Sequence, residues 1–197
     1  MIKTIVNIIL KYKAKIFIVL IFEIIYIFLL RYKGNSLKLL HSKLFTDNIP
    51  TPYLFLSKIS KFFKNKEIKQ MIDVGCGSGR VLYFFSRKNP NIKIDGYELN
   101  KCIFADTLKL KNNNKNIKIY NKNVLNEKLK KNYDIFFLAD PFKKVSDYNK
   151  FFNNILKNKK KIYIVIVNNN KFIISLKKLR ILNYYKCNKS GYKIYSN

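Results

Sequence analysis

The segment MIDVGCGSGR, residues 71–80, is the most informative part of the sequence about the fold of this chain. Its first residues are apolar, as in a buried strand, and Asp73 and Val74 run directly into a loop with three glycines at alternate positions. These glycines are Gly75, Gly77 and Gly79. Such glycines let the backbone turn tightly from a strand into a helix and expose its amides to a polar ligand. We therefore expect a ligand close to this loop.

An acidic residue follows at the end of the next apolar run, Glu98 in DGYELN. It comes about 20 residues after Gly79, where nucleotide-binding α/β folds place a carboxylate that accepts hydrogen bonds from ribose hydroxyls. The sequence therefore predicts a cofactor that carries a nucleoside.

Short apolar runs alternate with helical patterns on both sides of this loop. A helix is expected within residues 51–66, and from residue 70 onwards strands and helices take turns. Such alternation is typical of βαβ units that build a parallel sheet. The last two runs, LRILNYYKCN and GYKIYSN, are close enough to pair as an antiparallel hairpin. We expect an α/β, Rossmann-like fold: a seven-stranded, mostly parallel sheet with helices on both faces, a C-terminal antiparallel hairpin and a preceding N-terminal hydrophobic helix.

The N-terminal run IFIVLIFEIIYIFLL, residues 16–30, is apolar except for Glu23 and is flanked by basic residues. A helix of this length reaches roughly 22 Å, less than the ~30 Å hydrocarbon core of a bilayer. The run is compatible with a spanning or monotopic anchor, a cleaved signal peptide or an ordinary packed helix, but no small-residue cleavage site follows it. We expect a membrane-anchoring helix over residues 1–33, a linker over 34–50 and the catalytic domain over 51–197, facing the cytoplasm.

Composition narrows the classes of function. The chain has 40 Lys and Arg residues against 11 acidic ones, a formal charge of +29, which favours acidic partners such as anionic lipid. The charge is spread along the chain and does not gather beside an aromatic platform, so we expect no dedicated nucleic-acid function. The only histidine is His41, and the three cysteines form no C-x-x-C pair. We therefore expect neither a metal site nor a Ser-His-Asp triad.

The spacing G-x-G-x-G, rather than G-x-G-x-x-G, favours S-adenosylmethionine (SAM) over NAD as the cofactor. DVGCGSGR followed by GYELN resembles the class I SAM-dependent methyltransferases. The resemblance implies that Asp73 lies near the methionine ammonium and that Glu98 binds the ribose. Together with NKNVLN after the third strand, it implies a set of cofactor-binding residues. They are Asp73, Gly75, Cys76, Gly77, Gly79, Glu98, Leu99, Asn123 and Val124.

FLADPF, at the end of the fourth strand, resembles the substrate-edge signature of amino-group methyltransferases. Its candidate catalytic residues are Asp140, Pro141 and Phe142. TPY at residues 51–53, GSGR and GYELN are similar to membrane-anchored lysine methyltransferases, including the ATP synthase c-subunit type, whereas the DPF segment looks like small bacterial methyltransferases. The resemblance implies methyl transfer to an amine such as a protein lysine. The alternatives are a lipid, quinone or surface-glycan methyltransferase, or a non-catalytic basic module that binds membrane or nucleic acid.

Overall fold

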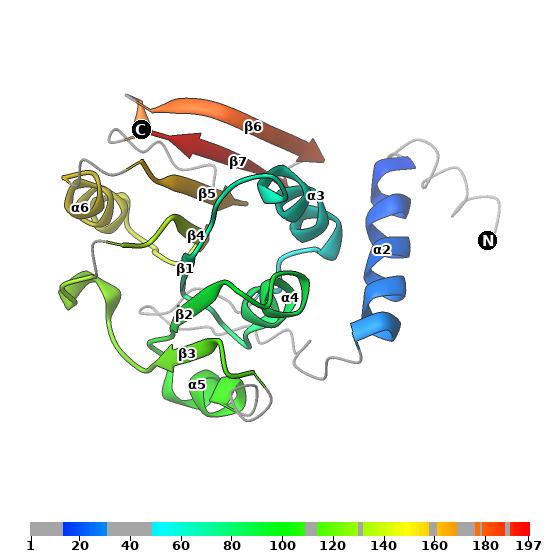
Figure 1. The fold of residues 1–197 in the computed structure, drawn as a ribbon, viewed down its shortest axis with the longest axis horizontal. Helices are drawn as coiled ribbons and strands as arrows, with labels where there is room; N and C mark the ends of the chain where they lie inside the picture. Colours follow the sequence, from blue (N-terminus) through cyan, green and yellow to red (C-terminus); the bar gives the residue numbers. More distant parts are fainter. Residues whose placement is uncertain are drawn as a thin grey trace.

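The computed structural model of the chain describes residues 14–30, 49–108, 114–129, 132–157, 161–168, 176–177, 179–187 and 190–197. Its centre is a seven-stranded sheet with the order β3-β2-β1-β4-β5-β7-β6 (Figure 1). The strands are β1 Gln70–Val74, β2 Lys93–Tyr97, β3 Ile117–Tyr120, β4 Ile135–Ala139, β5 Tyr163–Val167, β6 Arg180–Cys187 and β7 Ser190–Ser196. The helices are α2 Ala14–Leu30, α3 Tyr53–Phe63, α4 Arg80–Lys88, α5 Lys101–Leu108, α6 Val145–Ile155 and the short 3-10 helix η2 Val124–Asn126.

The order of the strands creates a switch point at the middle of the sheet. The chain builds β1, β2 and β3 in one direction and then returns to place β4 on the other side of β1. These strands are parallel, with Val74 of β1 paired to Tyr97 of β2 and to Leu138 of β4. The loops that follow β1, β2 and β4 therefore emerge at one edge, where open α/β sheets bind their ligands.

The two faces of the sheet are covered by different helices (Figure 1). Helices α3 and α4 pack on one face through aromatic and aliphatic side chains, among them Phe55, Ile59 and Phe84. Helix α6 packs on the other face through Tyr148 and Phe152. Burying large apolar side chains on both faces explains why the central strands read as continuous apolar runs.

The predicted hairpin at the C-terminus is confirmed. Strand β7 runs antiparallel to β5, with Val167 paired to Tyr192, and β6 runs antiparallel to β7 at the outer edge. The mostly parallel seven-stranded sheet with helices on both faces is confirmed as well.

An N-terminal helix exists, and it lies on the outside of α3 and α4 (Figure 1). One stripe of α2 packs against the domain, made by the partly buried Val19, Phe22, Tyr26 and Leu30. In the described parts of the chain, no helix has the length and apolarity needed to cross a membrane. The membrane-spanning interpretation of residues 1–33 is thus not supported, because the helix described is Ala14–Leu30. Residues 1–13 and 31–33 of the predicted anchor, and residues 34–48 of the predicted linker 34–50, lie outside the described residues.

Candidate cofactor and acceptor site

A cavity of about 530 Å³ lies where the loops after β1, β2 and β4 meet. Such a volume is typical of small-molecule sites. Its walls come from the glycine loop, the end of β2, the turn that leads into η2 and the segment after β4. The segment 49–51, which leads into α3, contributes a further wall.

The glycine loop needs glycine at the positions where the sequence has it. Gly75, Gly77 and Gly79 have φ values of 69°, 54° and 85°, a region that L-residues with a Cβ seldom occupy. A Cβ on Gly75 would lie 2.8 Å from the Cβ of Pro141, in the segment after β4. The Gly75 amide also donates to the Tyr97 carbonyl at 2.9 Å. The loop is therefore packed tightly between the ends of β2 and β4.

Glu98 is buried and already accepts two backbone hydrogen bonds. Its Oε2 accepts from the Gly77 amide at 3.0 Å, and its Oε1 accepts from the Asn100 amide at 2.8 Å. Burial raises the pKa of this carboxyl, and the two amides partly oppose that rise. The bond from the Gly77 amide to Glu98 connects the glycine loop to the end of β2, two motifs that the sequence analysis identified separately. A carboxylate fixed in this way retains lone pairs for the hydroxyls of a ribose.

Asp73 is 1% exposed and lines the cavity. Among the described residues its Oδ2 has no hydrogen-bond partner. Burial is the main reason that the pKa of Asp73 lies well above its ordinary value, and the negative charge of Glu98 raises it further. An orphaned carboxylate oxygen of this kind is completed by a cationic donor, and the methionine ammonium of SAM is one. The residues present therefore fit SAM at this end of the cavity.

The remaining predicted cofactor residues lie around the same cavity, apart from Gly79, which instead ends the loop as the N-cap of α4. Asn123 and Val124 line the cavity, and Asn123 also accepts a hydrogen bond of 3.0 Å from the Leu125 amide, which caps η2. Leu99 and Cys76 line it too. Burial holds the pKa of the Cys76 thiol well above its usual range, which disfavours the thiolate form that a nucleophile needs.

The candidate catalytic residues divide into two groups. Pro141 and Phe142 line the cavity, and Phe142 packs edge-on against Tyr148 with a 5.0 Å centroid separation. Asp140 is not among the residues that line the cavity. Its carboxylate accepts a 2.6 Å hydrogen bond from the Tyr148 hydroxyl, and its backbone has a φ of 50°. The structure thus directs Asp140 toward α6, where it shapes the segment after β4.

Two residues that support the site, Gly96 and Thr107, were not identified from the sequence. A Cβ on Gly96 would lie 2.7 Å from Leu82 Cδ1 and 3.0 Å from Cys76 Sγ, so Gly96 lets α4 and the glycine loop approach β2. The Thr107 hydroxyl lies 2.5 Å from the Gly77 carbonyl oxygen and holds the loop from α5. A glycine inside a strand is the one signal that could have pointed to such close packing. Thr107 gave no such signal.

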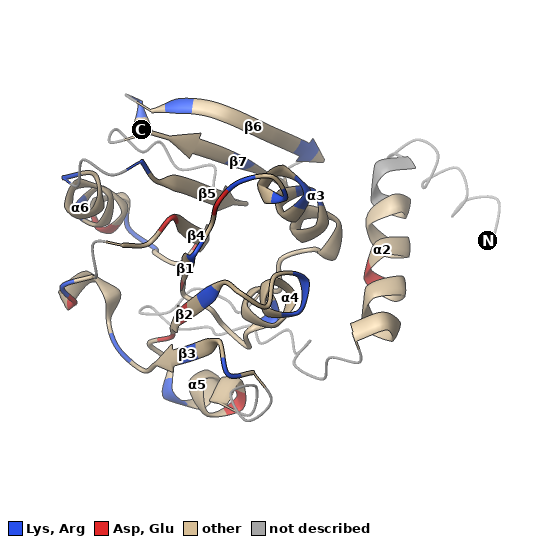
Figure 2. Cartoon of the chain, in the orientation of Figure 1, with Lys and Arg blue, Asp and Glu red and all other residues tan. Residues whose placement is uncertain are grey.

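Positively charged residues far outnumber negatively charged ones in this protein. Lys and Arg are spread over helices, strands and loops, whereas acidic residues are few (Figure 2). Lys122, Lys143 and Lys144 contribute to the cavity wall, together with Asp147 of α6. Across the described ranges, no group of three His, Cys, Asp or Glu side chains could hold a metal ion.

Comparisons with solved structures show the same fold. A SAM-dependent methyltransferase from Aquifex aeolicus aligns with a TM-score of 0.55 and 20% identity, over 72% of this chain and 88% of that one. The N-methyltransferase NodS of Bradyrhizobium japonicum aligns with a TM-score of 0.60 and 11% identity, over 72% and 92%. NodS in complex with S-adenosylhomocysteine aligns with a TM-score of 0.59 and 11% identity, over 72% and 83%.

Sequence comparison identifies the family. No curated protein sequence matches the chain. The family described as the methyltransferase small domain matches residues 53–196, which includes every predicted cofactor and acceptor residue. The chain therefore belongs to the methyltransferase small domain family and is a class I SAM-dependent methyltransferase.

Proposed function

We propose that this protein methylates an amine, such as the side chain of a protein lysine, at a membrane surface. The observation that carries the proposal is the contact between the segment after β4 and the glycine loop. Pro141 leaves no room for a Cβ on Gly75, and Phe142 continues the same wall of the cavity. An acceptor group beside Pro141 and Phe142 would therefore lie next to the cofactor.

The acidic side chains of the cavity favour an amine over an alcohol. We assign Asp73 and Glu98 to the cofactor, which leaves Asp147, in the first turn of α6, as the remaining described carboxylate of the wall. When bound, SAM supplies an electrophilic methyl group. An unactivated alcohol needs a strong base to become a nucleophile, whereas an amine needs only to lose its extra proton to solvent or to a weak base. The wall of Pro141 and Phe142 then orients the nitrogen lone pair.

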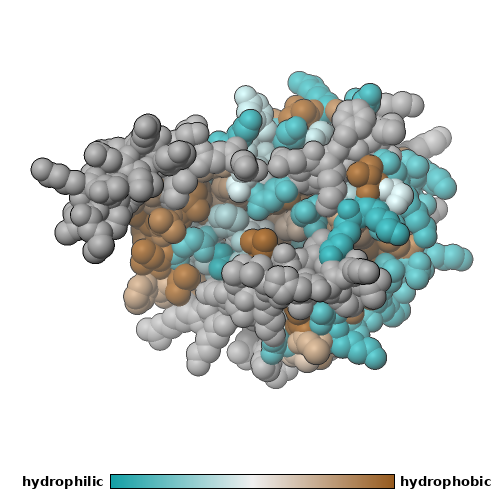
Figure 3. All heavy atoms as spheres, turned by 180° about the vertical axis from the view of Figure 1, so that it is seen from behind, coloured by the Kyte–Doolittle hydropathy of each residue, from teal (hydrophilic) through white to brown (hydrophobic). Residues whose placement is uncertain are grey.

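The outer face of α2 supports association with a membrane. Apolar residues gather at the position of α2 in the space-filling view (Figure 3). They include Phe28 and Leu29, with exposed fractions of 77% and 70%. A helix on the surface of a soluble domain ordinarily turns a polar face outward, whereas this one turns an apolar face outward. The charge of +29 would add attraction to anionic lipid. We place α2 in the plane of such a surface, with the methyltransferase domain on the cytoplasmic side.

The proposal is tested by labelling. The full-length protein is incubated with isotopically labelled SAM and membranes from cells that lack it, and the protein and lipid fractions are then separated. A Gly77→Asp variant, in which a side chain would fill the cofactor loop, is the matched control. We expect the label in the protein fraction, as methyllysine after acid hydrolysis.

Other distributions of the label contradict the proposal. Label that is recovered in the lipid extract identifies a lipid or quinone acceptor instead. Label that stays at the level of the Gly77→Asp control shows that no membrane component is the acceptor.

A further inference from the structure

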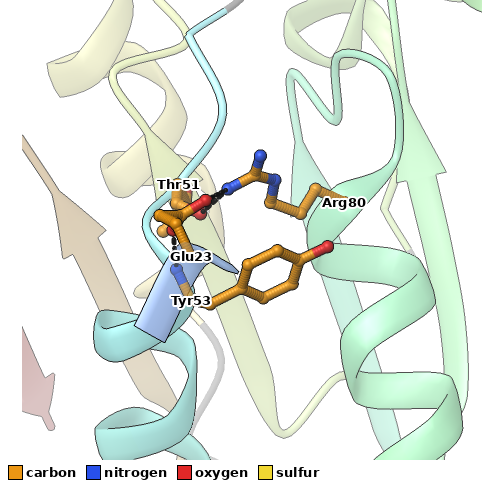
Figure 4. A network of polar contacts seen from close by, with 4 residues as sticks. All are labelled: Glu23, Thr51, Tyr53 and Arg80. Carbon is orange, nitrogen blue, oxygen red and sulfur yellow. Dashed lines mark hydrogen bonds and ion pairs between the residues drawn. The ribbon is translucent and has the colours of Figure 1, made fainter. Parts of the chain in front are cut away.

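Helix α2 contributes a charged group to the domain as well as an apolar surface. Glu23 is the only charged residue in the run 16–30, and its carboxylate points at the domain rather than outward (Figure 4). Its Oε2 lies 2.6 Å from Arg80 Nη1, and its Oε1 accepts a 2.5 Å hydrogen bond from the Tyr53 amide. The two charged side chains are 21% and 8% exposed, so little water screens the ion pair.

Arg80 connects this carboxylate to the cofactor cavity. It is the first residue of α4, directly after the glycine loop, and it lines the cavity together with Thr51. Its Nη1 also donates to the Thr51 carbonyl at 3.2 Å, and its guanidinium lies 4.4 Å from the centre of the Tyr53 ring. Glu23 thus holds two parts of the cavity wall at once: the segment before α3 and the start of α4.

We propose that Glu23 is a positioning residue for cofactor binding. By neutralising Arg80 and binding the Tyr53 amide, it gives the cavity its SAM-binding shape while α2 is docked. The proposal rests on the family's cofactor and not on the identity of the acceptor.

The physical reason is the cost of a buried charge without a partner. Without Glu23, the Arg80 guanidinium would remain in a mostly buried position with no ion-pair partner among the described residues, and removing one partner of such a pair is strongly unfavourable. The guanidinium would have to turn toward the cavity or toward solvent. Either movement displaces Thr51 and the first turn of α4, which carries the end of the glycine loop. Docking of α2 and binding of SAM are therefore thermodynamically linked.

The test is a titration of SAM into the full-length protein and its variants by calorimetry, with thermal unfolding measured in parallel. For Glu23→Gln we expect the Kd for SAM to rise roughly tenfold, equivalent to about 1.4 kcal/mol. The matched control is Ile24→Gln, which places the same side chain at the next position of α2, on the exposed face, and should leave the Kd unchanged. Glu23→Asp keeps the charge on a shorter side chain, so its Kd should lie between those of the parent and Glu23→Gln.

A double-mutant cycle shows whether the effect passes through Arg80. In an Arg80→Met background, Glu23→Gln should change the Kd by less than about twofold, because the charge to be neutralised is gone. Three results would overturn the proposal. The first is a Glu23→Gln variant that unfolds at a lower temperature but binds SAM with an unchanged Kd. The second is a full tenfold rise in Kd on Glu23→Gln in the Arg80→Met background. The third applies if Glu23→Gln fails to fold, and it is an unaltered Kd for Glu23→Asp.

Discussion

Replacing Asp73 by Asn should make the SAM-free protein more stable while weakening its binding of SAM. Asp73 is buried, and burial holds its folded-state pKa well above the value in an unfolded chain. Between those two pKa values the folded state holds a proton that the unfolded state has lost. The parent therefore loses stability as the pH rises through this window, and the neutral Asn variant does not share that loss.

The magnitude follows from the linkage between folding and proton binding. A single group can change the free energy of unfolding by at most about 1.4 kcal/mol for each pH unit in the window. An asparagine side chain also buries polar atoms at this position, so the cost of the unpaired Oδ2 is not relieved and only the cost of ionisation is removed. For a chain of this length, each kcal/mol shifts the unfolding temperature by about 2–4 °C. We expect Asp73→Asn to unfold at a higher temperature than the parent, by up to about 3–6 °C for each pH unit of the window, and this gap should not shrink as the pH rises.

The assay is thermal unfolding of the full-length protein from pH 6 to pH 8, with and without SAM. Because the variant lacks the carboxylate that we assign to the ammonium, its Kd for SAM should rise by more than about 100-fold, or about 3 kcal/mol. Glu67→Gln is the control, since that carboxylate is exposed and its pKa is lowered by Lys69, so it stays ionised throughout this range. A difference in unfolding temperature that shrinks as the pH rises, or an unchanged affinity for SAM, would contradict this prediction.

Three further predictions address the loop, the acceptor segment and the outer face of α2. Gly75→Ala should lower the free energy of unfolding by about 1–2 kcal/mol for its positive φ alone, and should weaken SAM binding because its Cβ displaces Pro141; an intact Kd by calorimetry would contradict this. Tyr148→Phe removes the hydrogen bond to Asp140, so steady-state kinetics should show a lower kcat while the Kd for SAM stays unchanged. A fall in kcat together with weaker SAM binding would point to a general loss of folding. Phe28→Gln should preserve folding and SAM binding but weaken sedimentation with anionic vesicles roughly 30-fold, about 2 kcal/mol; equal sedimentation of variant and parent would show that α2 does not contact lipid.

Most of the fold could be predicted because its signals are local. The apolar runs around β1, β4 and β5 mark buried strands, and the glycine loop has three glycines with positive φ values that other residues seldom adopt. The two final strands are separated by two residues, so their pairing needs little more than proximity.

Part of the site could not be predicted because it depends on contacts between distant segments. The sequence placed Asp140 beside Pro141 and Phe142, but the buried hydroxyl of Tyr148 in α6 draws the carboxylate away from the cavity. The need for Gly96 appears only when α4 is packed on β2. A hydrogen bond or a steric contact between segments leaves no pattern in the residues next to it.

The parallel sheet, the glycine loop, Glu98 as a candidate ribose ligand and the cofactor could all be inferred from the residues alone, because periodicity and short motifs carry that information along the chain. The tertiary structure alone decided which face of α2 meets the domain. In the sequence alone, Glu23 is a charged residue that interrupts an apolar run and would be unfavourable in a membrane-spanning helix. In the folded protein Glu23 instead binds Arg80 and the Tyr53 amide, because burying a guanidinium requires an opposing charge that only a distant segment could supply.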